Sequence, residues 1–403
     1  MQGLPAGRLL SISSMLPMLK SLLQFASYGF ALLALCGLGY LGLSLWSERR
    51  FLRRRGCSPA PDGFTPPVSI LKPLCGTDRQ MYESFRSHCL QDYPRYELIF
   101  GVNRADDEAV AEVERLQREF PAHDIRLMIC AAPTGANRKV SNLAQMLQAA
   151  KYDHIIVNDS DIRVETDYLC RIMAPMQDER VGMVTALYRA EAGKGIASRM
   201  EAATIATDFS GGVLCAIELD GRLTFGLGST LAFTRAAANA IGGLERLLDH
   251  LADDHELGKM IAEAGYEVVL SDVVVETFLP DYSFGAMFQH QLRWARTMRD
   301  LRKWGYAGVL MTFGLPWAIC AVGCAGGAAW SLALLVAVAA ARYASAAVLC
   351  GPVLHDRATM RDLWIIPLRD FAGVAIWFAA FGGNTIVWRG ERFHLKNGRL
   401  TRA

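Results

Sequence analysis

Residues 22–46 contain no Asp, Glu, Lys or Arg, and this apolar stretch predicts a membrane-spanning helix near the start of the chain. A helix that crosses a bilayer needs about 20 apolar residues, whereas the apolar part of a signal peptide has only about 7–15. Five arginines follow within residues 49–55. Because basic residues beside a span mark its cytoplasmic end, we expect the polypeptide after this helix to lie in the cytoplasm.

A second apolar region, residues 305–354, contains one charge, Arg342. It is too long for a single spanning helix, and the glycines within 323–327 offer a turn. We therefore expect two helices, at about 306–324 and 328–350. Arg342 lies near the end of the second, where its long side chain can reach the lipid headgroups. A functional charge inside the membrane is the alternative.

Residues 371–388 form a further apolar segment of marginal length. One span before the polar region and three after it would place the C-terminus outside the cell. Five basic residues between positions 389 and 402 favour the cytoplasm instead. Two explanations stay open: the segment lies at the interface or re-enters the membrane, or a span has been miscounted.

The polar middle of the chain, residues 65–300, alternates short apolar runs with amphipathic helical patterns. Alternation at this pace predicts βαβ units and an α/β fold with a mostly parallel sheet, which binds its ligands at the carboxyl ends of the strands. The expected strands are 68–71, 97–102, 125–129 and 154–157, and the expected helices are 109–120 and 142–150. We divide the chain into an N-terminal segment with its span (1–47), a cytosolic domain (48–304), C-terminal membrane or interfacial helices (305–388) and a basic tail (389–403).

Composition narrows the class of protein. The chain is 52% hydrophobic and 20% charged, which excludes disorder and argues against both a simple soluble enzyme and a multi-span transporter. The net charge of +2 gives no nucleic-acid signature. Ten cysteines occur without a CxxC pair, so we expect them to be reduced, as in a cytoplasmic domain.

Two carboxylates follow the expected strand 154–157. Asp159 and Asp161 are two residues apart, so in an extended chain their side chains share one face. Such a pair repels unless a cation lies between, and Mg²⁺ or Mn²⁺ prefers oxygen ligands of this kind. A solvated turn after the strand is the alternative.

A second acidic pair, Asp253 and Asp254, opens an expected helix. One of these carboxylates can serve as a general base, with a pKa adjusted by its neighbours. Plain capping of the helix start explains acids at this place equally well. His250 and His255 lie nearby but lack a cysteine partner, so a zinc site is disfavoured.

A basic helical segment, residues 290–296, comes just before the second apolar region. Arg293 and Arg296 lie on adjacent turns and can meet phosphate oxygens. Trp294 is also typical of membrane interfaces, so a basic helix lying on the headgroups is the alternative.

The order of these motifs resembles that of membrane-bound glycosyltransferases of families 2 and 21 with the GT-A fold. The closer resemblance is to ceramide glucosyltransferases and their bacterial relatives, including the hopanoid-biosynthesis glycosyltransferases. It extends over about residues 68–390. The matching segments are SILKPLCG (69–76), QDYPRYEL (91–98), NRKVSNL (137–143), AKYD (150–153), DSDIRV (159–164), DD (253–254), RW (293–294) and WRG (388–390).

The resemblance implies a UDP-sugar donor, a Mg²⁺ or Mn²⁺ cofactor and inverting transfer to a lipid hydroxyl. Asp159 and Asp161 would face the ribose and the metal, and Asp254 would take the acceptor proton. The arginine and tryptophan of the RW motif, Arg293 and Trp294, would close over the diphosphate and the acceptor.

Two lysines and one further segment are assigned on the same resemblance. Lys72 and Lys139 would contact the donor, unless they are surface lysines in loops. Residues 226–229 (GLGS) line the acceptor side or form an ordinary turn; glycines there would let a substrate approach the backbone.

Two positions depart from the family pattern. Arg104 stands where an acid follows the second strand, so Asp106 takes over the nucleotide contact in our assignment. His290 stands where Gln or Arg begins the closing motif. Imidazole can still donate to phosphate, so neither change excludes activity.

The sequence leaves the sugar open between glucose and N-acetylglucosamine, and the acceptor between a ceramide and a hopanoid polyol. The expected location is a bacterial inner membrane, with the catalytic domain in the cytoplasm. A processive polysaccharide synthase and a catalytically silent UDP-sugar-binding scaffold are the competing functions. The first would need more spans to build a pore, and Arg104 and His290 suggest the second.

Overall fold

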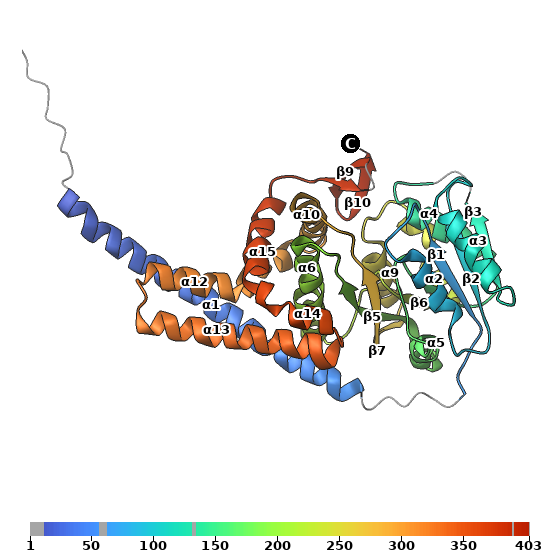
Figure 1. Ribbon diagram of the computed structural model, residues 1–403, viewed down its shortest axis with the longest axis horizontal. Coiled ribbons are helices and arrows are strands. Elements are labelled where there is room, and N and C mark those ends of the chain that lie inside the picture. Colours follow the sequence, from blue (N-terminus) through green and yellow to red (C-terminus); the bar gives the residue numbers. More distant parts are fainter. Residues whose placement is uncertain (1–11, 56–62, 131–133, 389–390, 403) are drawn as a thin grey trace, which may run out of the picture.

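The computed structural model describes residues 12–55, 63–130, 134–388 and 391–402. It consists of an α/β domain and a bundle of long apolar helices, joined by helices that lie between them (Figure 1). Three sequence assignments fall outside the described residues: the first eleven positions, Arg389 of the basic tail, and Gly390 of the WRG segment.

The bundle is built on one long N-terminal helix. Helix α1 (Ile12–Arg55) has 44 residues and extends beyond the predicted span at both ends. Helices α12 (Gly314–Cys324) and α13 (Ala329–Val348) run beside it (Figure 1). Helix α12 is preceded by α11 (Lys303–Val309) and the short turn η4 (Leu310–Thr312), and the two helical pieces bend by 53°.

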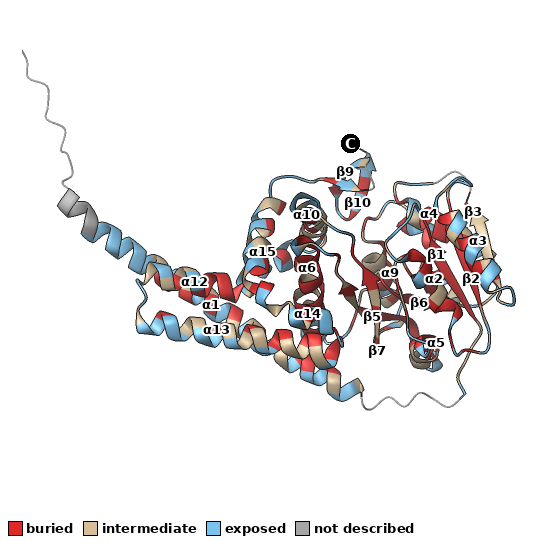
Figure 2. Ribbon diagram, in the orientation of Figure 1, coloured by how far each residue is buried: buried red, intermediate tan, exposed pale blue. Residues whose placement is uncertain are grey.

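The outer face of this bundle is apolar and exposed (Figure 2). Phe25 is 80% exposed, Leu32 64% and Val336 68%. Contiguous apolar surface of this kind marks an interaction with a membrane or a partner, and these helices are long and apolar enough to cross a bilayer. The structure therefore supports membrane association of the chain.

The α/β domain contains a seven-stranded sheet in the order β3-β2-β1-β4-β6-β5-β7. Strand β6 is antiparallel to both neighbours and the other pairs are parallel, which confirms the mostly parallel α/β class. Helices pack on both faces over separate apolar cores. The strands are β1 (Val68–Pro73), β2 (Tyr96–Val102), β3 (Ile125–Ile129), β4 (His154–Val157), β5 (Val181–Glu191), β6 (Leu231–Thr234) and β7 (Glu267–Phe278). The helices are α2 (Met81–Cys89), α3 (Ala109–Glu119), α4 (Arg138–Ala149), α5 (Tyr168–Met173), α8 (Arg235–Ala240) and α9 (Asp253–Glu263), with short turns η1 (Ala174–Gln177) and η3 (Leu244–Leu247).

A long apolar helix that the sequence analysis did not anticipate separates the domain from the bundle. It consists of α6 (Ile196–Ala203), the π-helical turn η2 (Thr204–Phe209) and α7 (Ser210–Asp220). It is long and apolar enough to cross a membrane, but 56% of its apolar window is buried within the protein, against 28–33% for the other long apolar helices. It therefore packs inside the molecule and connects its two parts.

The apolar segment 371–388 is not one helix. Helix α15 (Ile366–Ala380) starts before this segment, after the turn η6 (Leu363–Ile365), and β8 (Thr385–Trp388) occupies its end. Helix α15 packs beside α6 and α10 (Phe284–Leu301), across the direction of α1 and α13 (Figure 1). This orientation favours the explanation that the segment lies at the membrane interface. Two shorter helical pieces, η5 (Leu349–Val353) and α14 (Arg357–Arg361), precede η6 and α15 in the chain.

The C-terminal tail lies against the α/β domain. Strands β9 (Glu391–Lys396) and β10 (Arg399–Arg402) form a small sheet with β8. The Leu251 amide donates to the Gly398 carbonyl at 3.1 Å, and the Leu400 amide donates to the Asp249 carbonyl at 2.7 Å. The described C-terminal strands are therefore attached to the α/β domain, which agrees with the expectation from the basic residues that both lie on one side of a membrane.

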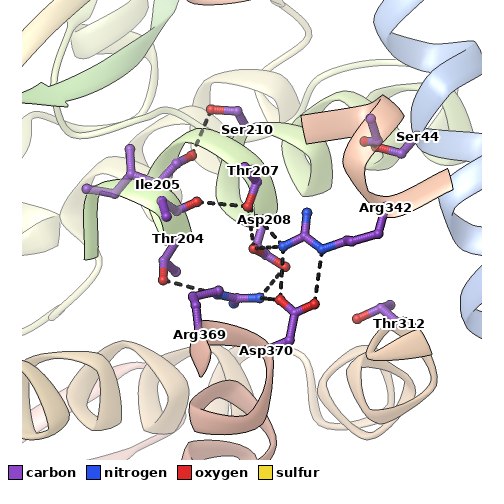
Figure 3. Close-up of polar contacts among 12 residues, drawn as sticks. Ser44, Thr204, Ile205, Thr207, Asp208, Ser210, Thr312, Arg342, Arg369 and Asp370 are labelled. Atoms are coloured by element: carbon purple, nitrogen blue, oxygen red, sulfur yellow. Dashed lines mark hydrogen bonds and ion pairs between the residues drawn. The ribbon is translucent and has the colours of Figure 1, made fainter. Parts of the chain in front are cut away.

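Arg342 does not reach toward the headgroups, so that expectation is wrong. It is 6% exposed and donates to both oxygens of Asp370, at 3.0 and 3.1 Å. It also contacts Asp208 of η2 at 3.1 Å, and Arg369 contacts the same two aspartates at 2.6 and 2.9 Å (Figure 3). Two arginines and two aspartates thus form a charge-balanced cluster, buried except for the half-buried Asp208, that joins α13, α15 and η2.

A close helix contact in the bundle yields a first prediction. A Cβ at Gly37 of α1 would lie 2.4 Å from the Gly314 Cα, whereas a Cβ at the exposed Gly39 would meet nothing within 4 Å. Gly37→Leu should force α1 and α12 apart and cost about 1–3 kcal/mol or more. Gly39→Leu is the matched control. Thermal unfolding of the two detergent-purified variants checks this, and equal melting temperatures would contradict it.

Candidate active site

The site forms where β1 and β4 end at one edge of the sheet. Leu71 of β1 pairs with Val157 of β4, and the chain then turns into residues 158–161. Lys72 is fully buried at this edge, and its Nζ donates to the Asp159 carbonyl at 2.9 Å. The alternative of a surface lysine is therefore wrong for Lys72. Burial lowers the pKa of Lys72 to about 7, although Asp161 and Asp159 act in the opposite direction.

Lys139 bridges the two acidic motifs. It lies on the first turn of α4, which begins four residues earlier than expected, and its side chain is 16% exposed, so it is not a loop lysine. Its Nζ is 2.6 Å from Asp159 Oδ1 and 3.8 Å from Asp253 Oδ2. Burial disfavours its charge, but the carboxylates of Asp159 and Asp253 outweigh burial and raise the pKa of Lys139. The bridge brings the start of α9 to the end of β4.

Asp254 lies on the first turn of α9 and faces the glycine loop before β6. A methyl group on Gly228 would lie 3.0 Å from Asp254 Oδ2 and 3.9 Å from Asp159 Oδ2. Asn158 holds this loop, because its Nδ2 donates to the Ser229 carbonyl at 2.8 Å. Asp254 Oδ1 accepts from the His255 amide at 2.8 Å, so one oxygen serves the helix start while the other faces the site. Burial and Asp253 raise the pKa of Asp254, and Lys139 opposes them.

Asp161 is held on the β7 side of the site. The Thr277 hydroxyl of β7 donates to its Oδ2. Burial, with the nearby carboxylate of Asp159, raises the pKa of Asp161 to about 6. Asp78, which sequence reasoning missed, adds to this effect and accepts a hydrogen bond from Ser160. Asp78 could have been recognised as a site residue from its position in the loop after β1, which ends at the same edge of the sheet.

These carboxylates suit a hard divalent cation with few protein ligands. Within the described parts of the chain, no group of three or more His, Cys, Asp and Glu side chains could hold a metal ion. Asp159 and Asp161 can supply two oxygens, and Mg²⁺ completes such a shell with water and substrate phosphate. The excess of acids over lysines at this edge favours a ligand that brings positive charge.

Arg293 and Trp294 lie on α10, and aromatic contacts lead from Trp294 toward the site. The Trp294 ring is 6.2 Å from that of Phe209, which in turn lies 5.1 Å from the ring of Tyr188. Burial raises the pKa of Tyr188, and so do Asp254, Glu201 and Asp161, in that order. Tyr188 thus connects the closing motif to the acidic edge, and no local sequence pattern singles it out. Arg296 instead donates to the Thr385 carbonyl of β8.

Asp106 lies at the surface after β2. It pairs with Arg104, with Nε 2.7 Å from its Oδ1, and their side chains are 67% and 75% exposed. That hydrogen bond lowers the pKa of Asp106. The neighbouring Asp107 accepts from the Gly76 amide at 3.0 Å and thereby ties the loop after β2 to the loop after β1. The role of Asp106 in nucleotide binding stays a prediction.

The sequence as a whole carries a family signature. Residues 29–401 match the model of Glycosyl transferase family 21. The chain belongs to this family. The match covers the α/β domain, α1 from residue 29 onward, the later apolar helices and the described C-terminal strands up to residue 401.

Curated relatives of this family 21 chain include two proteins of Caenorhabditis elegans. Ceramide glucosyltransferase 3 is 28% identical over 236 residues, which are 58% of this chain and 51% of that protein. Ceramide glucosyltransferase 1 is 24% identical over 353 residues, which are 84% of this chain and 73% of that protein. The aligned part thus spans about half of the first relative.

A solved structure supports the fold. A mannosyltransferase from Pyrobaculum calidifontis superposes with a TM-score of 0.50 and 20% identity, over 88% of this chain and 98% of that one. At this identity the likeness establishes the fold alone, a GT-A-type α/β domain with apolar helices. The fold expected from the resemblance is therefore confirmed.

The glycine between the two acidic motifs gives a second prediction. Gly228→Ala would push the Asp254 carboxylate or the loop by a few tenths of an ångström, because the added methyl would be only 3.0 Å away. We expect glycosyl transfer to fall by about tenfold or more, since misplaced catalytic groups cost up to about 100-fold. Gly212→Ala, whose Cβ has its nearest neighbour at 3.9 Å, is the control. Turnover assays check this; unchanged transfer would contradict it.

Proposed function

We propose that this chain is an inverting glycosyltransferase that moves a hexose from a UDP-sugar to the hydroxyl of a membrane lipid. The observation that carries the proposal is that the carboxylates of Asp254 and Asp159 both lie close to the same glycine, Gly228, because a methyl group there would be 3.0 and 3.9 Å from their Oδ2 atoms. Because glycine has no side chain, a sugar could lie against the backbone at Gly228, between Asp254 on the proposed acceptor side and Asp159 on the proposed donor side.

On the donor side, the proposed contacts are Lys72, Lys139, Asp159 and Asp161, with Asp106 at the rim. Asp159 and Asp161 would hold Mg²⁺ or Mn²⁺, which when bound neutralises the phosphates of the leaving UDP. The Lys139 ammonium lies 2.6 Å from Asp159 Oδ1 and therefore neutralises part of the negative charge of that carboxylate. The mannosyltransferase with the same fold was solved in complex with GDP-Man and Mn²⁺, which supports a nucleotide-sugar and a divalent ion here.

On the acceptor side, Asp254 accepts the proton of the attacking hydroxyl. Its raised pKa brings the group nearer to neutrality, where a general base works best. Arg293 would donate to the diphosphate, and Trp294 would cover the acceptor. Positioning and charge stabilisation would then supply most of the rate, because inverting transfer is a direct displacement of UDP by the acceptor oxygen, without a covalent enzyme intermediate.

The arrangement of helices supports a lipid acceptor. Helix α10 carries Arg293 and Trp294 and packs against α15 and α6, the two apolar helices that lie between the domain and the bundle. A lipid moving sideways out of the bilayer would therefore enter beside the helix that carries Trp294. We propose that the domain faces the cytoplasm of a bacterial cell, at the inner membrane, because the arginine-rich end of α1 leads into it.

The choice of substrates follows the relatives. Their names, ceramide glucosyltransferase, support glucose and a ceramide as the first pair to test. N-acetylglucosamine and a hopanoid polyol are the second pair. The experiment incubates the purified chain with each UDP-sugar, total lipid extract, and Mg²⁺, Mn²⁺ or chelator. Mass spectrometry identifies the product. A ladder of oligomers would replace the proposal by a processive synthase, and no transfer with either ion would refute it.

Asp254 gives the third prediction. Asp254→Asn should lower turnover by about 100-fold or more, because the amide cannot accept the hydroxyl proton. UDP binding should persist, since the donor contacts remain. Glu263→Gln, an exposed acid at the end of the same helix, is the matched control. Lipid glycosylation and UDP affinity are measured on both variants. Wild-type transfer by Asp254→Asn would refute its role as the base.

The pH dependence gives the fourth prediction. Both Asp161 and Asp254 work as carboxylates, and burial raises the pKa of each above the usual value of 3.8, to about 6 for Asp161. Transfer should therefore be lost as the pH falls through about 6, well above the usual range of an aspartate. Initial rates against pH at saturating lipid check this. A rate that is level down to about pH 4.5 would contradict it.

A further inference from the structure

A cavity of about 1000 Å³ lies between the arginine-rich end of α1 and β7, the last strand in the order of the large sheet. Its walls also include parts of α7, η1 and the loop 221–223. None of the described residues that we assign to the donor, the base or the closing motif lines it. Asp272 of its wall lies five residues before Thr277 of the catalytic edge, roughly 16 Å along the strand. This α1–β7 cavity is therefore separate from the candidate active site.

Apolar side chains form a large part of the wall of the α1–β7 cavity. They come from α1, α7, the loop 221–223 and β7, and they include Phe51, Leu214, Ile217, Leu223 and Val268. Pockets that hold small ligands have volumes of about 300–1000 Å³, so this cavity is large enough for a lipid headgroup and the apolar part next to it.

Four arginines line the same cavity: Arg54, Arg55, Arg171 and Arg222. Three acids line it too, and each of them pairs with an arginine. The pairs are Arg50–Glu218 at 3.0 Å, Arg171–Asp272 at 3.1 Å and Arg180–Glu267 at 3.6 Å. Among the described residues, neither Arg55 nor Arg222 has a carboxylate within ion-pair distance, and Arg55 donates to two backbone carbonyls instead. The cavity therefore keeps positive charge that no described acid neutralises.

The titration of a nearby histidine reports the same positive charge. Burial lowers the pKa of His355, and four arginines lower it further: Arg55, Arg189, Arg171 and Arg357. Two of these, Arg55 and Arg171, belong to the wall of the α1–β7 cavity. Several like charges on one flank of a protein add to a field that attracts an anion.

The position of the cavity along α1 indicates where such an anion comes from. The predicted span ends at residue 46, and the wall of the cavity begins at Ser47. Residues 47–55 extend about 12 Å along the helix axis, whereas the headgroup layer of a bilayer is about 5–7 Å thick. The cavity therefore begins at the depth of the headgroups and continues toward the cytoplasm.

We propose that the α1–β7 cavity binds an anionic phospholipid, whose phosphate contacts Arg54 and Arg222 and whose glycerol and upper acyl chain lie against the apolar wall. A zwitterionic phospholipid carries its own ammonium beside the phosphate, so the unneutralised arginines favour the anionic lipid. A lipid in this place contacts α1, α7 and β7 at once and joins the membrane bundle to the α/β domain.

The experiment titrates the full-length protein in detergent with dioctanoyl-phosphatidylglycerol or dioctanoyl-phosphatidylcholine, and native mass spectrometry counts the bound lipid. One phosphatidylglycerol should bind about tenfold or more tightly than phosphatidylcholine. Arg222→Gln should weaken this binding about fivefold, the effect of one basic residue at an anionic surface, and the double variant Arg54→Gln/Arg222→Gln about 30-fold. Ala174→Phe, which fills the cavity and keeps every arginine, should also weaken it.

Arg49→Gln is the matched control, because Arg49 is an exposed arginine of the same helix end that does not line the cavity. It should bind phosphatidylglycerol as the wild type does. An equal loss in Arg49→Gln and Arg222→Gln would overturn the inference, even if Ala174→Phe fails to fold, and so would equal affinities for the two lipids.

A further arm distinguishes a lipid from a soluble anion. Inorganic phosphate that displaces phosphatidylglycerol at equal concentration would identify a site for soluble anions and overturn the assignment to a phospholipid. These binding measurements involve no sugar transfer, so failure of the proposed enzymatic function would leave this inference standing.

Discussion

The ion bridge of Lys139 is the contact on which the candidate site depends. Four aspartates, Asp159, Asp161, Asp253 and Asp254, meet at one partly buried edge, where like charges repel strongly. Lys139 lies between two of them and belongs to a third element, the start of α4. Its ion pairs thereby join two acidic motifs that are almost a hundred residues apart in the chain.

The bridge leaves the edge short of positive charge. Burial lowers the pKa of Lys72 to about 7, so its amine offers only part of a charge near neutral pH. Two aspartates, Asp161 and Asp254, keep raised pKa values as a result of burial and of their acidic neighbours. A site in this state favours the binding of a divalent cation. The phosphates of a nucleotide donor would need a further positive charge, which Arg293 of α10 is proposed to supply.

Local patterns predicted much of the fold and of the site. Strands 125–129 and 154–157 were predicted at their observed bounds, because short apolar runs between polar turns are distinctive. The aspartate pair after β4 was found for the same reason. The helix Ile196–Asp220 was missed, because Arg199, Glu201 and Asp208 interrupt its apolar pattern.

Those interrupting charges find their partners far along the chain, which no local pattern reports. Asp208 pairs with Arg342 and Arg369, more than a hundred residues away, and Glu201 pairs with His290. The same limit explains the wrong expectation for Arg342. From the sequence alone, an arginine near the end of an apolar stretch is expected to contact lipid headgroups, because its partners elsewhere in the chain are not visible. Lys72 and Lys139 were left open as loop lysines because their burial depends on packing of the whole domain.

The C-terminal strands couple the membrane part to the proposed base. The chain leaves α15, forms β8 to β10, and hydrogen-bonds residues 249–251, the loop that leads into α9 and Asp254. Arg299 of α10 donates to Asn384 and to the Gly383 carbonyl at the start of this sheet. The helix that carries Arg293 and the loop before Asp254 are thus fixed to one small sheet. Through this sheet, α15 is connected both to the helix that carries Arg293 and to the loop before the proposed base.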